Sequence, residues 1–258
     1  MRTFKVILSY DGSDFSGFQS QSNARSVQAE LEAALAEVEG TRVVVHGAGR
    51  TDAGVHALGQ VASFKLSNSI GADDLRRALN AKLPGDVRVL SAEEAAPGFN
   101  ARFHARSKIY RYRISNTRVL SPFQRRYAWH ISRSLDLDAM RRAAREFVGQ
   151  HDFGSFHALG SAAKTSIRTM TQSDWAEEPL AGGGRLLTYE IAGTGFLKYM
   201  VRTIVGTLVE VGDGHRTADS MRALLGAKRR AAAGPTAPPT GLYLVRVDYD
   251  AAGPVSFT

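Results

Sequence analysis

The order of secondary-structure elements is decided by residues 41–66, which read TRVVVHGAGRTDAGVHALGQVASFKL. The valine-rich run 41–46 and the alternating run 59–66 have the composition of two β-strands. Three glycines lie in the loop between them, and glycine permits backbone conformations and close approaches that other residues resist. The segment therefore predicts two neighbouring strands joined by a tight loop, which carries Asp52.

Helical patterns flank these two strands. Ser26 can cap a helix that Gly40 terminates, and residues 73–83 place their apolar side chains on one helical stripe. Short apolar runs at 4–10 and 87–90 supply two more strands. The predicted order is β-α-β-β-α-β, the split βαβ pattern of ferredoxin-like and RRM-like domains.

The second half of the chain repeats this pattern more loosely. Strands are expected at 109–115, 167–175, 186–191 and 242–249, and helices at 137–148, 197–211 and 219–225. We therefore expect an α+β fold of two split-βαβ lobes with largely antiparallel sheets. The N-terminal lobe, residues 1–104, would carry Asp52, and the C-terminal lobe would span residues 105–258.

The composition points to a partner and a compartment. The chain of 258 residues has 33 Lys and Arg against 25 Asp and Glu, a formal net charge of +8. A basic excess of this size favours a polyanionic partner such as nucleic acid, although it does not determine the fold. The chain has no cysteine, which excludes disulfides and thiolate metal sites. Its apolar runs are too short for a signal peptide or a membrane span, so we expect no membrane association and a cytoplasmic location.

Asp52 is the first candidate for chemistry. Arg50 stands two residues before it, and a neighbouring guanidinium favours the ionised carboxylate. A charged, accessible carboxylate on a tight turn suits nucleophilic catalysis, although the same residues would also form a polar turn with a surface ion pair. His46 and His56 flank Asp52, but no helix places them four residues apart, so we do not expect a metal site. The glycines also lack the spacing of a nucleotide-binding loop.

A basic and aromatic run between residues 102 and 118 is the second candidate. In a strand, Tyr110 and Tyr112 share one face, and Arg111 and Arg113 share the other. A tyrosine on a sheet face beside basic residues can stack on an unpaired base. One of the two tyrosines could instead belong to the core, which suits Tyr112 better than Tyr110.

Two cations interrupt the apolar helix expected at 197–211. Lys198 and Arg202 stand one turn apart on it. Long basic side chains commonly extend past apolar surface to reach solvent. Arg202 could alternatively point into a partly buried site and pair there with a carboxylate.

Taken together, these segments resemble the TruA family of tRNA pseudouridine synthases. The match covers nearly the whole chain, and its motifs fall in the family's order. The chain departs from the family at Phe18, where the family often has Trp, and at Ser20, where it often has a basic residue. The matching motifs are residues 10–12, 17–19, 49–56, 59–61, 80–86, 101–103, 110–112, 200–206 and 241–243.

The resemblance implies an isomerase that needs no cofactor and no metal. Enzymes of this family detach uracil from ribose and rejoin it through C5, giving pseudouridine. They act on positions 38 to 40 in the anticodon arm of tRNA, and they work as homodimers. Their two α+β lobes join their sheets around a central cleft.

The resemblance also implies roles for four residues. Asp52 matches the nucleophile, and Tyr110 matches the tyrosine that stacks on the target base. Arg202 matches the basic residue that pairs with the nucleophile. Arg50 matches the arginine implicated in helping the target nucleotide leave its stack. The sequence leaves open whether the nucleophile attacks C1′ or C6, and which group removes the proton from C5.

Two other functions fit part of the sequence. A non-catalytic RNA-binding protein would use the basic strand and Tyr110 in the same way, although a carboxylate such as Asp52 repels phosphate. A metal-dependent hydrolase would instead use His46, Asp52 and His56.

Overall fold

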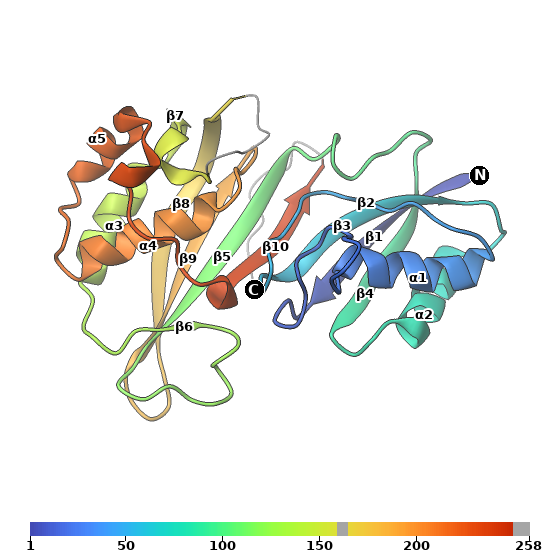
Figure 1. Cartoon of the computed structure of the whole chain (residues 1–258), viewed down its shortest axis with the longest axis horizontal. Helices are drawn as coiled ribbons and strands as arrows, with labels where there is room; N and C mark the ends of the chain where they lie inside the picture. Colours follow the sequence, from blue (N-terminus) through green and yellow to red (C-terminus); the bar gives the residue numbers. More distant parts are fainter. Residues whose placement is uncertain (159–164, 250–258) are drawn as a thin grey trace. The chain divides into compact units, whose positions relative to one another are not determined.

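The computed structural model describes residues 1–158 and 165–249. Its contacts divide the chain into two compact units (Figure 1). Unit 1 comprises Met1–Arg106 together with the strand segment that begins at Tyr243, and unit 2 comprises Ser107–Leu242. This grouping differs from the division at residue 104 expected from the sequence, because the last strand hydrogen-bonds to a strand of unit 1. The joining of the lobes around a central cleft stays a prediction.

Unit 1 is a mostly antiparallel sheet with helices on one side (Figure 1). Its elements are β1 (Arg2–Tyr10), α1 (Val27–Glu39), β2 (His46–Gly47), β3 (His56–Leu66), α2 (Ala72–Lys82), β4 (Val87–Ala95) and β10 (Leu242–Asp248). The strands follow the order β4-β1-β3-β10, and β10 is the parallel neighbour of β3. The antiparallel pairs are β1 with β3, β1 with β4 and β2 with β3. The predicted β-α-β-β-α-β order is confirmed.

The first helix begins and ends where the sequence predicts. The Ser26 hydroxyl accepts a hydrogen bond from the backbone N–H of Ala29 at 3.4 Å, and Gly40 ends the helix with φ 78°. Leu35 of α1 is fully buried, and on the strands the buried rings of Phe4 and Phe64 stack with centroids 6.2 Å apart. Capping and apolar patterning therefore agree with the packing of this unit.

The strand predicted over 41–46 is wrong for most of its length, because only His46 and Gly47 form β2. The N–H of Val45 donates to the Glu32 carboxylate at 3.1 Å. The carbonyl of Val45 accepts from the Gln28 side-chain amide at 3.2 Å. Side chains of α1 thus satisfy the backbone that a neighbouring strand would otherwise have paired.

The strands of unit 2 are also mostly antiparallel, and helices accompany them (Figure 1). Its elements are β5 (Ser107–Asn116), β6 (Trp129–His130), α3 (Leu137–Arg145), β7 (Gly149–Asp152), β8 (Ile167–Pro179), β9 (Arg185–Gly193), α4 (Met200–Gly212) and α5 (Ser220–Ala227). Single turns of 3-10 helix lie at Gly154–Phe156, Arg230–Ala232 and Pro239–Gly241. The strand order is β5-β9-β8-β7, with β6 parallel to β5. The α+β class with largely antiparallel sheets is confirmed in both units, whereas β6 and β7 were not predicted.

Helix length bears on membrane association. Among the residues that the structure describes, every helix is too short or too polar to cross a bilayer.

Candidate active site

Asp52 lies in the loop that leads into β3, and its side chain is half-buried. The residue before it, Thr51, is held at two points. The Thr51 hydroxyl is 2.8 Å from the hydroxyl of Tyr10, and the Thr51 carbonyl accepts from the N–H of Phe18 at 3.1 Å. The Asp52 carbonyl accepts from the N–H of Val55 at 3.1 Å and closes a turn. Hydrogen bonds within the protein therefore fix the backbone of the loop that carries the carboxylate.

Two glycines outside the loop let a second segment pack directly against it. Gly17 has φ 102°, and a Cβ atom there would lie only 2.6 Å from the Thr51 carbonyl oxygen. A Cβ at Gly12 would lie 2.0 Å from the carbonyl oxygen of Val55. A side chain at either position would push the supporting segment away from the loop. The motifs at residues 10–12 and 17–19 thus support the Asp52 loop.

The opposite side of the loop is held by β3. The Gln60 side-chain amide donates to the Gly49 carbonyl at 2.9 Å, and the N–H of Ala48 donates to the Val61 carbonyl at 2.7 Å. Burial raises the pKa of Tyr10 to about 12, so its hydroxyl stays protonated and can keep its bond to Thr51. Arg50 is exposed on the same loop, where its guanidinium is accessible to a polyanion.

His56 has a structural environment. It is 1% exposed, and its ring stacks on Tyr243 with centroids 4.7 Å apart. Its Nδ1 accepts a hydrogen bond from the N–H of Gly12 at 3.1 Å and lies 3.2 Å from Oδ1 of Asp11. His46 is exposed on β2, and within the described part of the chain no group of three or more His, Asp or Glu side chains could hold a metal ion. His46, Asp52 and His56 therefore do not form such a group.

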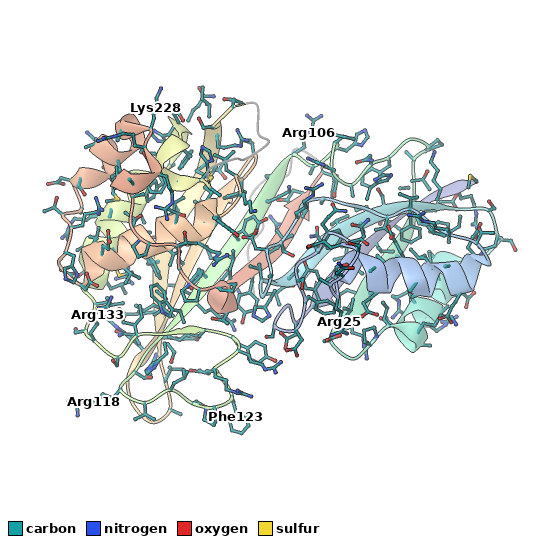
Figure 2. The ribbon with its side chains drawn as sticks, in the orientation of Figure 1. Arg25, Arg106, Arg118, Phe123, Arg133 and Lys228 are labelled. Carbon is teal, nitrogen blue, oxygen red and sulfur yellow. The ribbon has the colours of Figure 1, made fainter. Side chains whose placement is uncertain are left out.

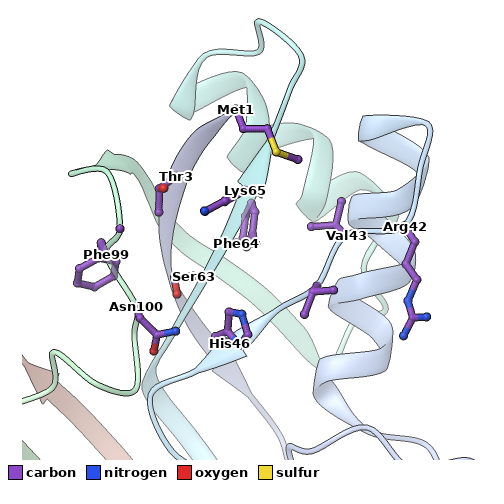
Figure 3. A pocket seen from close by; sticks show the side chains of 12 residues that line it. Met1, Thr3, Arg42, Val43, His46, Ser63, Phe64, Lys65, Phe99 and Asn100 are labelled. Atoms are coloured by element: carbon purple, nitrogen blue, oxygen red, sulfur yellow. The ribbon is translucent and has the colours of Figure 1, made fainter.

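A pocket of about 420 Å³ in unit 1 lies elsewhere on the sheet (Figure 3). Residues of β1, β2 and β3 and of the turn 98–100 line it. Figure 3 shows His46 and Lys65 among the polar side chains at this pocket. Its lining does not include Asp52, so this pocket is not where the carboxylate lies.

Tyr110 and Tyr112 both point into buried surroundings from β5. Tyr110 is 8% exposed and meets the edge of Phe196, with ring centroids 4.8 Å apart. Tyr112 is completely buried, and its hydroxyl donates to the Pro238 carbonyl at 2.7 Å. Tyr112 is thus the core residue of the two, and Tyr110 retains a small accessible area.

The arginines of the same strand are only partly accessible. Arg111 and Arg113 are half-buried, and Arg111 forms an ion pair with Glu190, with Nη2 2.7 Å from Oε1. Other cations of the protein surface are also paired: Arg25 with Asp86, Arg133 with Asp213 and Lys228 with Asp152 (Figure 2). The side chains of Arg133 and Lys228 are nevertheless 55% and 63% exposed, and Arg106 and Arg118 are exposed as well (Figure 2).

Arg202 lies in the first turn of α4 and is half-buried. Its Nε donates to the Ala237 carbonyl at 2.7 Å, and its own carbonyl accepts from the N–H of Ala237 at 3.1 Å. The crossing segment can approach the helix because a Cβ at Gly206 would lie 1.8 Å from the Pro235 carbonyl oxygen. Lys198, in contrast, is exposed to solvent. Arg202 is therefore anchored rather than extended into solvent.

The predicted site residues fall into two groups. Unit 1 holds Asp52 and Arg50 on one loop, and unit 2 holds Tyr110 and Arg202. Within unit 2, Arg202 donates to the Ala237 carbonyl and Tyr112 donates to the Pro238 carbonyl, so adjacent residues of one segment contact both Arg202 and β5. The pairing of Asp52 with Arg202 stays a prediction.

Several supporting residues were not found from the sequence. The contact of Phe196 with Tyr110 and the anchoring of Arg202 by Ala237 join segments that are distant along the chain, and neither has a local signal. Tyr10 was assigned only to a strand and a motif, although alternation along β1 could have marked its side chain as inward-facing.

Comparison with known proteins identifies the family. A family model described as tRNA pseudouridine synthase matches residues 6–104 and 143–250, so the chain belongs to that family. Asp52 and Arg202 lie within the matched segments, whereas Tyr110 lies between them. The resemblance inferred from the motifs is confirmed.

Individual relatives match over nearly their full length. The tRNA pseudouridine synthase A of Acetivibrio thermocellus is 45% identical over 249 residues, which cover 96% of this chain and 100% of the relative. The protein of the same name from Afipia carboxidovorans is 48% identical over 250 residues, with 96% and 100% covered. That of Streptococcus equi subsp. equi is 43% identical over 251 residues, with 97% and 100% covered.

Proposed function

We propose that this chain converts uridine to pseudouridine at positions 38 to 40 in the anticodon arm of tRNA. The observation that carries the proposal is Asp52, a half-buried carboxylate on a loop held at Thr51, in a chain of the tRNA pseudouridine synthase family. The reaction breaks the glycosidic C–N bond and forms a C–C bond at C5 without net oxidation or reduction. It therefore requires no cofactor and no metal. The enzyme acts in the cytoplasm as a homodimer.

Asp52 is the nucleophile and attacks C1′ of the ribose or C6 of the base. An ionised carboxylate in a site that excludes water is costly unless it is paired. Arg202 is the partner, and a guanidinium at close range lowers a carboxyl pKa by roughly 1–3 units. The bond from Arg202 Nε to the Ala237 carbonyl supports this role, because it orients the guanidinium before any substrate binds.

The target uridine must leave its stack before it can react, which costs a few kcal/mol. Stacking on Tyr110 returns about 1–3 kcal/mol of this cost. The edge contact with Phe196 supports the role of Tyr110, because it fixes the plane on which a base would stack. Arg50, exposed on the Asp52 loop, assists the departure of the nucleotide from its neighbours.

Release of tritium from tRNA labelled at C5 of uridine tests the proposal. The wild-type protein should release tritium, whereas Asp52→Asn and Asp52→Ala should bind tRNA within a few fold of wild type and release none. Asp73→Asn is the matched control, because the Asp73 side chain is 85% exposed on α2 and should not affect turnover. Turnover by Asp52→Asn at the wild-type rate would remove the assigned nucleophile. Binding of tRNA by the wild type without any tritium release would favour a non-catalytic RNA-binding protein.

A further inference from the structure

Tyr199, the residue before α4, has an unusual backbone conformation. Its φ of 64° and ψ of 2° lie in the left-handed region, where the Cβ atom of a bulky residue meets steric resistance. Lys228, with φ 51°, is the other residue besides glycine with a positive φ in the described chain. Glycine or asparagine would meet the backbone requirement with less strain, and Tyr199 makes no capping hydrogen bond with its side chain. Capping the helix therefore does not account for the tyrosine.

Two cations lie close to the ring of Tyr199. The Cζ atom of Arg202 is 5.0 Å from the ring centroid, and the Nζ atom of Lys198 is 5.1 Å from it. Lys198 is exposed and Arg202 is half-buried. A cation interacts more strongly with an aromatic face when it is removed from water, so Arg202 gains more from the ring.

The guanidinium of Arg202 is consequently held in two directions. Its Nε donates to the Ala237 carbonyl at 2.7 Å, which fixes one edge of the planar group. The aromatic ring of Tyr199 lies near the guanidinium carbon and restricts rotation out of that position. A guanidinium with a fixed plane loses less conformational freedom when it pairs with a carboxylate.

We infer that Tyr199 is a positioning residue that orients Arg202 for the reaction. The inference rests on the proposed function, in which Arg202 pairs with the nucleophile. Strained backbone conformations persist where surrounding contacts enforce them, and they are concentrated at functional sites. The strain at Tyr199 is the cost of placing an aromatic ring beside Arg202.

Substitutions of Tyr199 distinguish the effect of its aromatic ring from the effect of its strained backbone conformation. Tyr199→Gly removes the ring and relieves the strain, so kcat for tritium release should fall about tenfold while the KM for tRNA changes less than about twofold. The melting temperature should stay level or rise, which is opposite to the result for a merely structural tyrosine. Tyr199→Asn, which also tolerates the left-handed region, should be equally slow. Tyr199→Phe keeps the ring and should restore the wild-type kcat.

Lys228→Gly and Lys198→Met are the controls. Lys228 is the other non-glycine residue with a positive φ in the described chain. Lys228→Gly relieves the backbone strain there and should leave kcat unchanged. Lys198→Met removes the exposed cation from the same ring and should also leave kcat near wild type. A wild-type kcat in both Tyr199→Gly and Tyr199→Asn would overturn the inference, as would a Tyr199→Phe variant as slow as they are. Absence of tritium release by the wild type would instead show that the proposed function itself has failed.

Discussion

The Asp52 loop and the Arg202 turn hold their functional side chains by different means. In unit 1, backbone hydrogen bonds to Thr51 and Val55 fix the loop, and Gly12 and Gly17 allow the close approach. In unit 2, a carbonyl from a distant segment and an aromatic ring hold the guanidinium itself. Asp52 is thus placed by the main chain of its loop, whereas the Arg202 guanidinium is placed by contacts of its own side chain.

Removing the guanidinium is the largest expected perturbation of the second region. Arg202→Met should lower kcat roughly 100-fold, because the Asp52 carboxylate would lose the guanidinium that pairs with it and orients it. Arg202→Lys should recover part of this loss, since it restores the charge without the planar fork. The measurement is tritium release at saturating tRNA, with exposed Arg118→Met as the control. Wild-type turnover in Arg202→Met would rule out the proposed ion pair.

Adding one methyl group tests the main-chain mechanism of the first region. Gly17→Ala should destabilise unit 1 by about 2–3 kcal/mol, since the new Cβ meets both an unfavourable φ and the Thr51 carbonyl. Gly98→Ala is the matched control, because Gly98 also has a positive φ, 84°, but open space around it. It should cost only about 1 kcal/mol. Equal losses in chemical denaturation would mean that the close approach to Thr51 carries no energy.

Tyr110 allows the contribution of a ring to be separated from that of its hydroxyl. Tyr110→Ala should weaken tRNA binding about tenfold by removing the stacking surface, and it should also lower the rate. Tyr110→Phe should bind like the wild type and yet react more slowly. Filter binding and single-turnover tritium release distinguish the two properties. If both variants behave identically, the hydroxyl has no part in the reaction.

The smallest expected effect concerns the hydrogen bond between the Tyr10 and Thr51 hydroxyls, next to Asp52. Tyr10→Phe removes the bond to Thr51 and should destabilise the protein by about 1 kcal/mol at neutral pH. Because burial raises the pKa of Tyr10 from 10.0 to about 12, its stabilising effect is complete below pH 10 and is lost as the pH rises through about 12. The difference in unfolding free energy between wild type and Tyr10→Phe should therefore shrink over this range. A difference independent of pH would show that the hydroxyl of Tyr10 is not the titrating group.

Much of unit 1 could be predicted because its signals are local. Ser26 and Gly40 bound a helix through capping chemistry, and the glycines around Asp52 mark a tight loop. The strand predicted over residues 41–45 is absent because of a tertiary contact. The side chains of Gln28 and Glu32 on α1 form the hydrogen bonds with the Val45 backbone that a neighbouring strand would otherwise form. The periodicity of the sequence does not show that side chains of a helix replace a neighbouring strand as hydrogen-bond partners.

The Arg202 region was harder to predict for the same reason. Arg202 was recognised as unusual on an apolar helix, but its anchor, Ala237, lies in a proline-rich segment for which no helix or strand was predicted. Tyr199 gave no signal, because a tyrosine is not the residue that a left-handed conformation favours. β6 and β7, of two and four residues, are too short to show an alternating pattern.

Single-turnover tritium release by Asp52→Asn, with enzyme in excess over labelled tRNA, tests the central assignment most directly. The substitution preserves the size of the side chain and removes its charge. The hydrogen bonds of Thr51 and the affinity for tRNA should therefore both be retained. We predict a rate reduced by about 10³-fold or more, with affinity within a few fold of wild type. Tritium released at the wild-type rate by a variant confirmed to contain asparagine would contradict it.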